Sequence, residues 1–179
     1  REVAPHDSVE RYTGLGVEVI EGTAKLTSPW TVEVTTATGI RTLSTRAIVI
    51  AAGARPFVPP IPGLEEVGYL TSDTVWNLRE LPKRLVVLGG GPIGSELTQT
   101  FARLGGQVTQ VEMGPRILSR EDPEVSALVA ERFRKEGVAV LTEHKAKQFV
   151  VENGEKILIA EQGGQAVRIP FDAVLVAVG

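Results

Sequence analysis

The sequence lacks cysteine entirely, and its 179 residues include only two histidines and one methionine. Without cysteine the chain has no disulfide framework, no thiolate metal site and no cysteine nucleophile. The two histidines, His6 and His144, are isolated from each other in the sequence and are too few for a histidine-based metal site. We therefore assign neither of them a role.

An excess of charge of one sign is also lacking. The 19 basic and 22 acidic residues give a net charge of −3, so no surplus of lysine and arginine is available to neutralise nucleic-acid phosphates. Apolar runs are short, as in 47–52, whereas a bilayer span needs roughly 18 apolar residues. The first residues show no charged and then apolar pattern of a signal peptide, so we expect none. We expect a cytoplasmic protein that binds neither nucleic acid nor membrane.

The two ends of the chain have the features of a fragment. The chain starts at Arg1, and its single methionine is Met113. It stops at Gly179, directly after the apolar run 172–178, which predicts a buried strand that needs neighbours on both sides. A length of 179 residues corresponds to one domain and part of another. We therefore expect a piece of a longer protein.

Short strands are predicted in the first third of the chain. Their residues alternate or are β-branched, and turn signals such as Ser28-Pro29 separate them. The continuous apolar run that comes next predicts a strand covered on both faces. The predicted strands are 17–20, 30–36, 40–44 and 47–52.

A proline-rich connector, 55–63, follows these strands. Proline fixes φ and has no N–H donor, so this segment is the best candidate for a domain boundary. We divide the chain into residues 1–62 and 63–179. After the boundary, Ser72 can cap a short helix over 73–79.

The second half alternates strands and helices. One predicted helix ends at Gly105, and a second begins at Asp122 and Pro123 and ends at Gly137. The first helix has an apolar stripe of Ile93, Leu97, Phe101 and Leu104, and the second one of Val125, Leu128, Val129 and Phe133. The predicted strands are 84–88, 107–111, 138–141, 146–151, 155–161, 166–170 and 172–178.

The segment Gly89–Gly94 matches the G-x-G-x-x-G pattern of dinucleotide-binding turns. The pattern alone is weak, but here it lies between a buried strand and an amphipathic helix, as the fold requires. Gly89 permits a tight turn, Gly91 lets a pyrophosphate approach the backbone, and Gly94 allows close packing of helix on strand. The free N–H groups at the helix N-terminus then face the phosphates. The alternative is a glycine-rich turn without a ligand.

Glu112 ends the next strand and can accept hydrogen bonds from both hydroxyls of an adenine ribose. A carboxylate there repels a 2′-phosphate, so the sequence favours NAD(H) over NADP(H). Arg116 is close in sequence, and either softens this preference or is a solvated surface arginine.

Four segments together resemble the FAD-dependent pyridine nucleotide-disulfide oxidoreductases, most closely their dihydrolipoamide dehydrogenase and mercuric reductase branch. They are Leu85–Leu97, Val108–Glu112, Ala47–Pro56 and Asp172–Gly179, in the family's order. The resemblance implies that residues 1–62 are the last part of a first FAD-binding segment and that 63–179 are an NAD(H)-binding domain. The fold class expected is α/β: a Rossmann-like parallel sheet with helices on one side and a three-stranded antiparallel β-meander, preceded by a partial FAD-domain β segment.

The resemblance also implies which residues contact the cofactors. Glu112 would lie at the adenosine end of NAD(H), and Ile93 and Glu96 toward the nicotinamide. The implied NAD(H) contacts are Gly89, Gly90, Gly91, Pro92, Ile93, Gly94, Ser95, Glu96, Glu112, Met113, Ala146 and Gly179. The implied FAD contacts are Ala24, Ala52, Gly53 and Ala54.

The function implied is transfer of hydride from NADH to FAD and on to an unknown acceptor, which could be a disulfide, a metal ion or another group, in a homodimeric parent protein. The family's first G-x-G-x-x-G and its cysteine pair have no counterpart in this chain, so we expect no catalytic residue here. One alternative is a non-catalytic NAD(H)-binding module or redox sensor, which would need an effector element. Another is an autonomous NAD dehydrogenase, which would need a catalytic His, Lys or Tyr constellation. The sequence offers neither feature.

Overall fold

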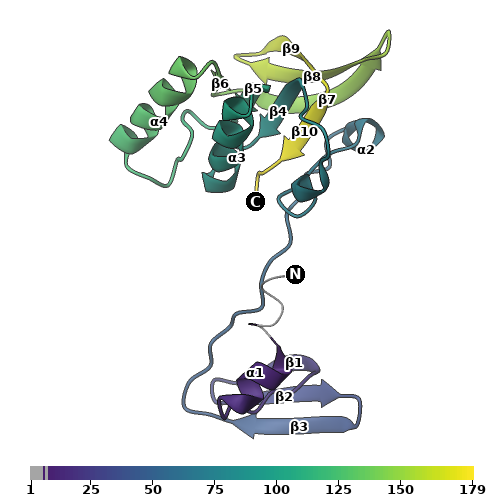
Figure 1. Ribbon diagram of the computed structural model, residues 1–179, viewed down its shortest axis with the longest axis vertical. Helices are drawn as coiled ribbons and strands as arrows, with labels where there is room; N and C mark the ends of the chain where they lie inside the picture. The colour runs from purple at the N-terminus through teal and green to yellow at the C-terminus, as the bar shows by residue number, and fades with distance from the viewer. Residues whose placement is uncertain (1–5, 7) are drawn as a thin grey trace. The chain divides into compact units, whose positions relative to one another are not determined.

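The computed structural model describes residue 6 and residues 8–179, and the chain forms two compact units (Figure 1). The first unit extends to Gly53, and the second runs from Ala54 to Gly179. None of the described helices combines the length and the apolar composition that a membrane span requires.

The first unit consists of a short helix and a three-stranded antiparallel sheet. Helix α1 (Val9–Gly14) begins after Ser8, whose Oγ accepts a hydrogen bond from Arg11 N–H at 3.2 Å, as an N-cap does. The sheet has the order β1-β2-β3. Its strands are β1 (Thr23–Ser28), β2 (Thr31–Thr36) and β3 (Gly39–Ser44). The predicted strands 30–36 and 40–44 are therefore confirmed.

Two expectations for this unit are wrong. Residues 17–20 form no strand, and β1, which the sequence did not predict, completes the sheet instead. Residues 47–52 also form no strand, and Val49 and Ile50 are 88% and 74% exposed. A continuous apolar run is stable as a strand when neighbours cover it, and no described strand pairs with this one. The run therefore stays irregular and exposed.

A four-stranded parallel sheet of the order β10-β4-β5-β6 forms the centre of the second unit. Leu88 of β4 pairs with Val176 of β10 on one side and with Val111 of β5 on the other. Because the strands are parallel, their carboxyl ends share one edge of the sheet. The strands are β4 (Arg84–Leu88), β5 (Gln107–Val111), β6 (Ala139–Leu141) and β10 (Ala173–Val176), which confirms the prediction for each.

Two helices, α3 (Pro92–Arg103) and α4 (Pro123–Lys135), cover one face of this sheet (Figure 1). Strand side chains at alternate positions, such as Leu85 and Val87, pack against this helical layer. Both helices begin and end where the sequence predicts, within one or two residues.

The predicted apolar stripes of the two helices are only partly buried. Leu97 and Phe133 are in the core, but Ile93 and Leu104 are 51% and 64% exposed. Helix α3 packs closely on the sheet through the buried small residues Gly94, Ser95 and Thr98. The larger side chains near its two ends, Ile93 and Leu104, point into solvent instead. Val125 and Leu128 of α4 are exposed as well.

A three-stranded antiparallel meander covers the other face of the sheet. Its strands are β7 (Lys145–Glu152), β8 (Glu155–Gln162) and β9 (Gln165–Phe171), paired in that order. Phe149 and Phe171 meet edge to face with ring centroids 5.7 Å apart, against Val86 and Val174 of the sheet. The predicted meander and the predicted α/β fold class are confirmed.

The segment between the proline-rich connector and β4 differs from its prediction. Only a single 3-10 turn, η2 (Val75–Asn77), lies within the predicted helix 73–79, and a short helix α2 (Leu64–Val67) precedes it. Thr71, not Ser72, organises this turn, because its N–H donates to Thr74 Oγ1 at 2.9 Å. Local capping chemistry competes here with helix extension.

Candidate functional site

The turn between β4 and α3 lies at the carboxyl edge of the parallel sheet and begins with three glycines. Gly89 has a φ of 107°, which favours glycine. A Cβ on Gly89 would also lie 2.2 Å from the carbonyl oxygen of Ala177, just beyond β10. A Cβ on Gly94 would lie 2.4 Å from the carbonyl oxygen of Gly89. The turn and the close packing of α3 therefore require glycine at both positions.

At Gly91, neither the backbone conformation nor a neighbouring atom requires glycine. Its φ of −71° suits any residue, and a Cβ there would meet nothing within 4 Å. Gly91 is the N-cap of α3, where the first backbone N–H groups have no partner within the helix and form the positive end of its dipole. Open space at such a terminus is what close approach of a phosphate requires, so these residues fit the pyrophosphate of a dinucleotide.

The carboxylate of Glu112, just after β5, is held by two backbone amides. Its Oε2 accepts a hydrogen bond from Gly90 N–H at 2.6 Å, and its Oε1 accepts one from Gly114 N–H at 2.6 Å. The backbone of Glu112 is fixed as well, because its N–H donates to Leu141 O and its carbonyl accepts from His144 N–H. Carboxylate oxygens accept more than one hydrogen bond, so this fixed group can still receive ribose hydroxyls.

A pair of buried polar side chains lies between β5 and α3, against the glycine turn. Gln110 is 0% exposed, and its Nε2 donates to Gly89 O at 3.1 Å and to Ser95 Oγ at 3.2 Å. Ser95 Oγ in turn donates to Gly90 O at 3.4 Å. Sequence reasoning missed Gln110, although a polar residue within an apolar strand is a usable signal.

The loop after β5 packs back on the glycine turn. Leu118 N–H donates to Gly90 O at 2.6 Å, with Leu118 itself at a φ of 49°. The guanidinium of Arg116 donates to the carbonyls of Ser119 and Glu121 at 2.7 and 2.8 Å. The Arg116 side chain is therefore engaged by its own loop in this structure.

Among the described residues, the remaining predicted NAD(H) contacts form no side-chain hydrogen bond with the glycine turn. Ile93 and Met113 are 51% and 68% exposed, next to the helix N-terminus and to Glu112 respectively. Glu96 and Gly179 are exposed too, on α3 and after β10. Ala146, near the start of β7, is half-buried and packs against the core on the meander side. Pro92 occupies the first helical position, where a missing N–H costs nothing.

The predicted flavin contacts belong to other parts of the chain. Ala24 is exposed in β1 of the first unit, and Ala52, Gly53 and Ala54 are exposed and lie in no strand. Among the described helices, α3 alone begins at a glycine-rich turn. The four flavin candidates do not form a second phosphate-binding turn.

Comparison with known proteins places this geometry beside redox enzymes. The family model described as pyridine nucleotide-disulphide oxidoreductase matches residues 4–179. Mercuric reductase of Staphylococcus aureus is 37% identical over 174 residues, which cover 97% of this chain and 30% of that protein. Dihydrolipoyl dehydrogenase of Chlorobaculum tepidum is 38% identical over 167 residues, which cover 91% and 35%.

A solved structure agrees with these similarities. The HOCl-induced flavoprotein disulfide reductase RclA from Escherichia coli matches with a TM-score of 0.67 and 31% identity. The match covers 90% of this chain and 36% of that one. The chain thus spans only 30%, 35% and 36% of the lengths of these three proteins.

Proposed function

The chain belongs to the pyridine nucleotide-disulphide oxidoreductase family, and from that premise we propose that it carries the NAD(H)-binding site of a flavin-dependent oxidoreductase. When bound, NADH supplies the hydride that FAD accepts and passes on as electrons to an acceptor. The relatives include a mercuric reductase and a dihydrolipoyl dehydrogenase, and we propose that the acceptor is a disulfide, a metal ion or another group.

The observation that carries the proposal is the juxtaposition of two features at one edge of the sheet. Gly91 leaves open space at the N-terminus of α3, and the Glu112 carboxylate is fixed 2.6 Å from the neighbouring Gly90 N–H. In the proposed complex the helix N-terminus offsets the charge of the pyrophosphate, and Glu112 accepts the ribose hydroxyls. Two separate parts of one dinucleotide are thereby recognised.

The same carboxylate supports a preference for NAD(H) over NADP(H). A 2′-phosphate on the ribose would meet the negative charge of Glu112, which two amides keep in place. In this structure the Arg116 guanidinium donates to the backbone carbonyls of Ser119 and Glu121.

The other implied contacts complete the proposed site. Ile93 and Glu96 lie in the first two turns of α3 and would face the nicotinamide half, with Gly179 across the same sheet edge. Met113 and Ala146 would border the adenosine. Ala24, Ala52, Gly53 and Ala54 would contact FAD in the whole protein.

The substitution Gly91→Val tests the proposal. Because a Cβ at Gly91 meets nothing in the protein, we expect the fold to persist while the new side chain occupies the space of the pyrophosphate and abolishes measurable NADH binding. NADH fluorescence titration measures the affinity, and circular dichroism checks the fold.

Gly14→Val is the matched control, because Gly14 also has open space around its Cβ but belongs to the first unit. This variant should bind NADH as the parent chain does. Parental affinity in a folded Gly91→Val variant would show that the turn is purely structural.

A further inference from the structure

The peptide bond between Gly89 and Gly90 is held at both ends by side chains, one from β5 and one from just beyond the end of that strand. Its carbonyl oxygen accepts a hydrogen bond from Gln110 Nε2 at 3.1 Å, and its N–H donates to Glu112 Oε2 at 2.6 Å. Gln110 lies in β5 and Glu112 two positions further on, just after the strand ends, and both side chains reach the glycine turn. A trans peptide directs its C=O and N–H oppositely, and fixing the carbonyl therefore aims the N–H.

Gln110 is costly for stability at this position. Its side chain is 0% exposed between the buried Val108 and Val111, and its Oε1 has no hydrogen-bond partner among the described residues. A buried acceptor without a partner destabilises the folded state, so packing alone would favour an apolar side chain. The benefit of the amide must then come from what its nitrogen holds.

The orientation of this amide follows from its partners. Gly89 O can only accept, so the donor nitrogen must face it and Oε1 must point away. The second N–H of the amide donates to Ser95 Oγ, which donates onward to Gly90 O. One buried chain of hydrogen bonds thus holds both carbonyls at the start of the glycine turn.

We propose that Gln110 is a positioning residue of the nucleotide site, which sets the peptide between Gly89 and Gly90 so that Gly90 N–H holds the Glu112 carboxylate ready for the ribose. This inference rests on the proposed function. Gln110 acts through Gly90 and Glu112 and does not touch the ligand. Its loss removes the side-chain donor that fixes Gly89 O, so Gly90 N–H is aimed less well at Glu112, which Gly114 N–H still holds.

The variant Gln110→Met tests the inference, because methionine is unbranched and of similar length but has no donor. Loss of one hydrogen bond that positions a charged group predicts an NADH affinity about 5- to 10-fold weaker. The temperature of thermal unfolding should change little, because removal of the unpaired Oε1 offsets the loss of the donor to Gly89 O. Gln110→Leu, tested in parallel, should give the same weakening if the methionine variant folds poorly.

Thr98→Val is the matched control. Thr98 is also 0% exposed, lies one turn along α3 from Ser95, and has an Oγ1 without a partner among the described residues. Its replacement removes a buried polar atom from the same layer without touching the glycine turn. NADH affinity should therefore equal that of the parent chain.

A double-mutant cycle separates positioning from a general structural effect. If Gln110 acts through Glu112, Gln110→Met should change NADH affinity by less than about twofold once Glu112 is alanine, because the two sites are coupled. Effects that multiply independently would overturn the inference and leave the NAD(H) site intact. A parent chain that binds no NADH would instead overturn the proposed function itself, and the inference with it.

Discussion

Each glycine of the turn between β4 and α3 has a different physical role. Gly89 and Gly94 are in close contact with backbone atoms, whereas Gly91 faces open space. Gly90 lies against Glu112, where an added Cβ would be 2.9 Å from Oε2. Substitutions at these positions should therefore separate protein stability from nucleotide binding.

Gly94→Ala should destabilise the chain more than Gly91→Ala does. The new methyl group at position 94 would lie 2.4 Å from Gly89 O, so α3 must move away from β4. Overpacking of this kind lowers the free energy of unfolding by about 1–3 kcal/mol, whereas Gly91→Ala has only the cost of alanine in place of glycine at an N-cap, about 0.5 kcal/mol. Urea denaturation followed by circular dichroism measures both, and equal values for the two variants would contradict the packing role of Gly94.

Glu112→Ala should narrow the preference for NADH over NADPH. The variant loses hydrogen bonds to the ribose and also loses repulsion of a 2′-phosphate, so NADH should bind more weakly and NADPH less unfavourably. Fluorescence titration with the two nucleotides gives the ratio of dissociation constants. Equal affinities in the parent chain would remove Glu112 from its assigned role.

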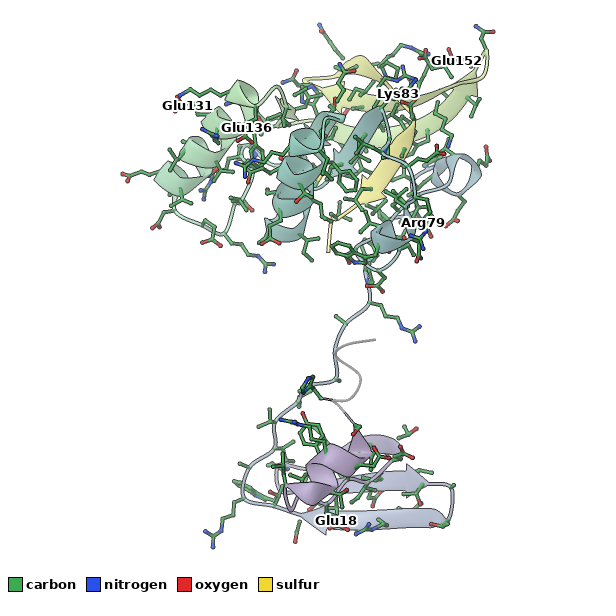
Figure 2. All side chains as sticks on the ribbon, viewed as in Figure 1. Glu18, Arg79, Lys83, Glu131, Glu136 and Glu152 are labelled. Atoms are coloured by element: carbon green, nitrogen blue, oxygen red, sulfur yellow. The ribbon has the colours of Figure 1, made fainter. Side chains whose placement is uncertain are left out.

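At the scale of elements, Glu136 joins the two helices of the second unit. It follows α4, and its carboxylate accepts hydrogen bonds from Arg103 at 2.8 Å and Gln99 at 3.1 Å on α3, and from Arg132 at 2.7 Å. Figure 2 labels Glu136 between the ribbons of α4 and α3. Hydrogen bonds from Arg103, Arg132 and Gln99, in that order of effect, lower the pKa of Glu136 from 4.5 to about 2.

This shift predicts a pH dependence of stability. A carboxyl whose pKa is depressed in the folded state stabilises the fold above its unfolded pKa and loses that contribution as pH falls through the folded value. The parent chain should therefore lose stability between pH 4.5 and about 2. Glu136→Gln should be less stable at pH 7 and decline less over this interval, as measured by thermal unfolding. Parallel pH profiles of the two chains would show that Glu136 contributes nothing to the acid sensitivity.

The segment from β4 through α3 to β5 was predictable because its local signals agree. An apolar run, a glycine turn, a helical period and a closing Gly105 with a φ of 102° all indicate the same structure. The run 47–52 has equally strong local signals, but a buried strand depends on neighbours that its own sequence does not contain. Burial of α3 was likewise mispredicted at Ile93, because small residues set how closely the helix approaches the sheet.

In the candidate site, too, some residues were predictable from local sequence and others were not. The glycines and Glu112 were found from a sequence motif with a fixed spacing. The structure brings them together at one edge of the sheet. Gln110 and Gly114 were missed, since their contacts depend on the register of β5 beside β4 and on the path of the next loop. Register is a tertiary property that no short window of sequence specifies.

For the whole molecule, the two units differ in how much core they contain. Val34 is the only buried residue among those described up to Gly53, whereas two clusters of buried side chains lie on the two faces of the parallel sheet in the second unit. Little apolar burial means little stability, so the first unit should unfold first. Limited proteolysis should cleave it before the second unit, and simultaneous loss of both would contradict this order.

The 179-residue chain should bind FAD weakly and be colourless. A flavin dinucleotide needs a helix N-terminus for its own pyrophosphate, and the one glycine-rich turn among the described helices is already used by the proposed NAD(H) site. A visible spectrum of the purified protein and calorimetric titration with FAD measure this. A yellow protein with tightly held, stoichiometric flavin would show that a complete flavin site exists.

The location of the NADH site is the central claim, and backbone amide NMR of the 15N-labelled chain tests it most directly. Addition of NADH should shift the resonances of Gly90, Gly91 and Gly114, because Gly90 and Gly114 N–H hold Glu112 and Gly91 N–H would face the pyrophosphate in the proposed complex. Residues of α3's first turn should shift with them, and the meander tips at Gly154 and Gly164 should not. Saturable shifts centred away from the glycine turn, or none at millimolar NADH, would contradict the account.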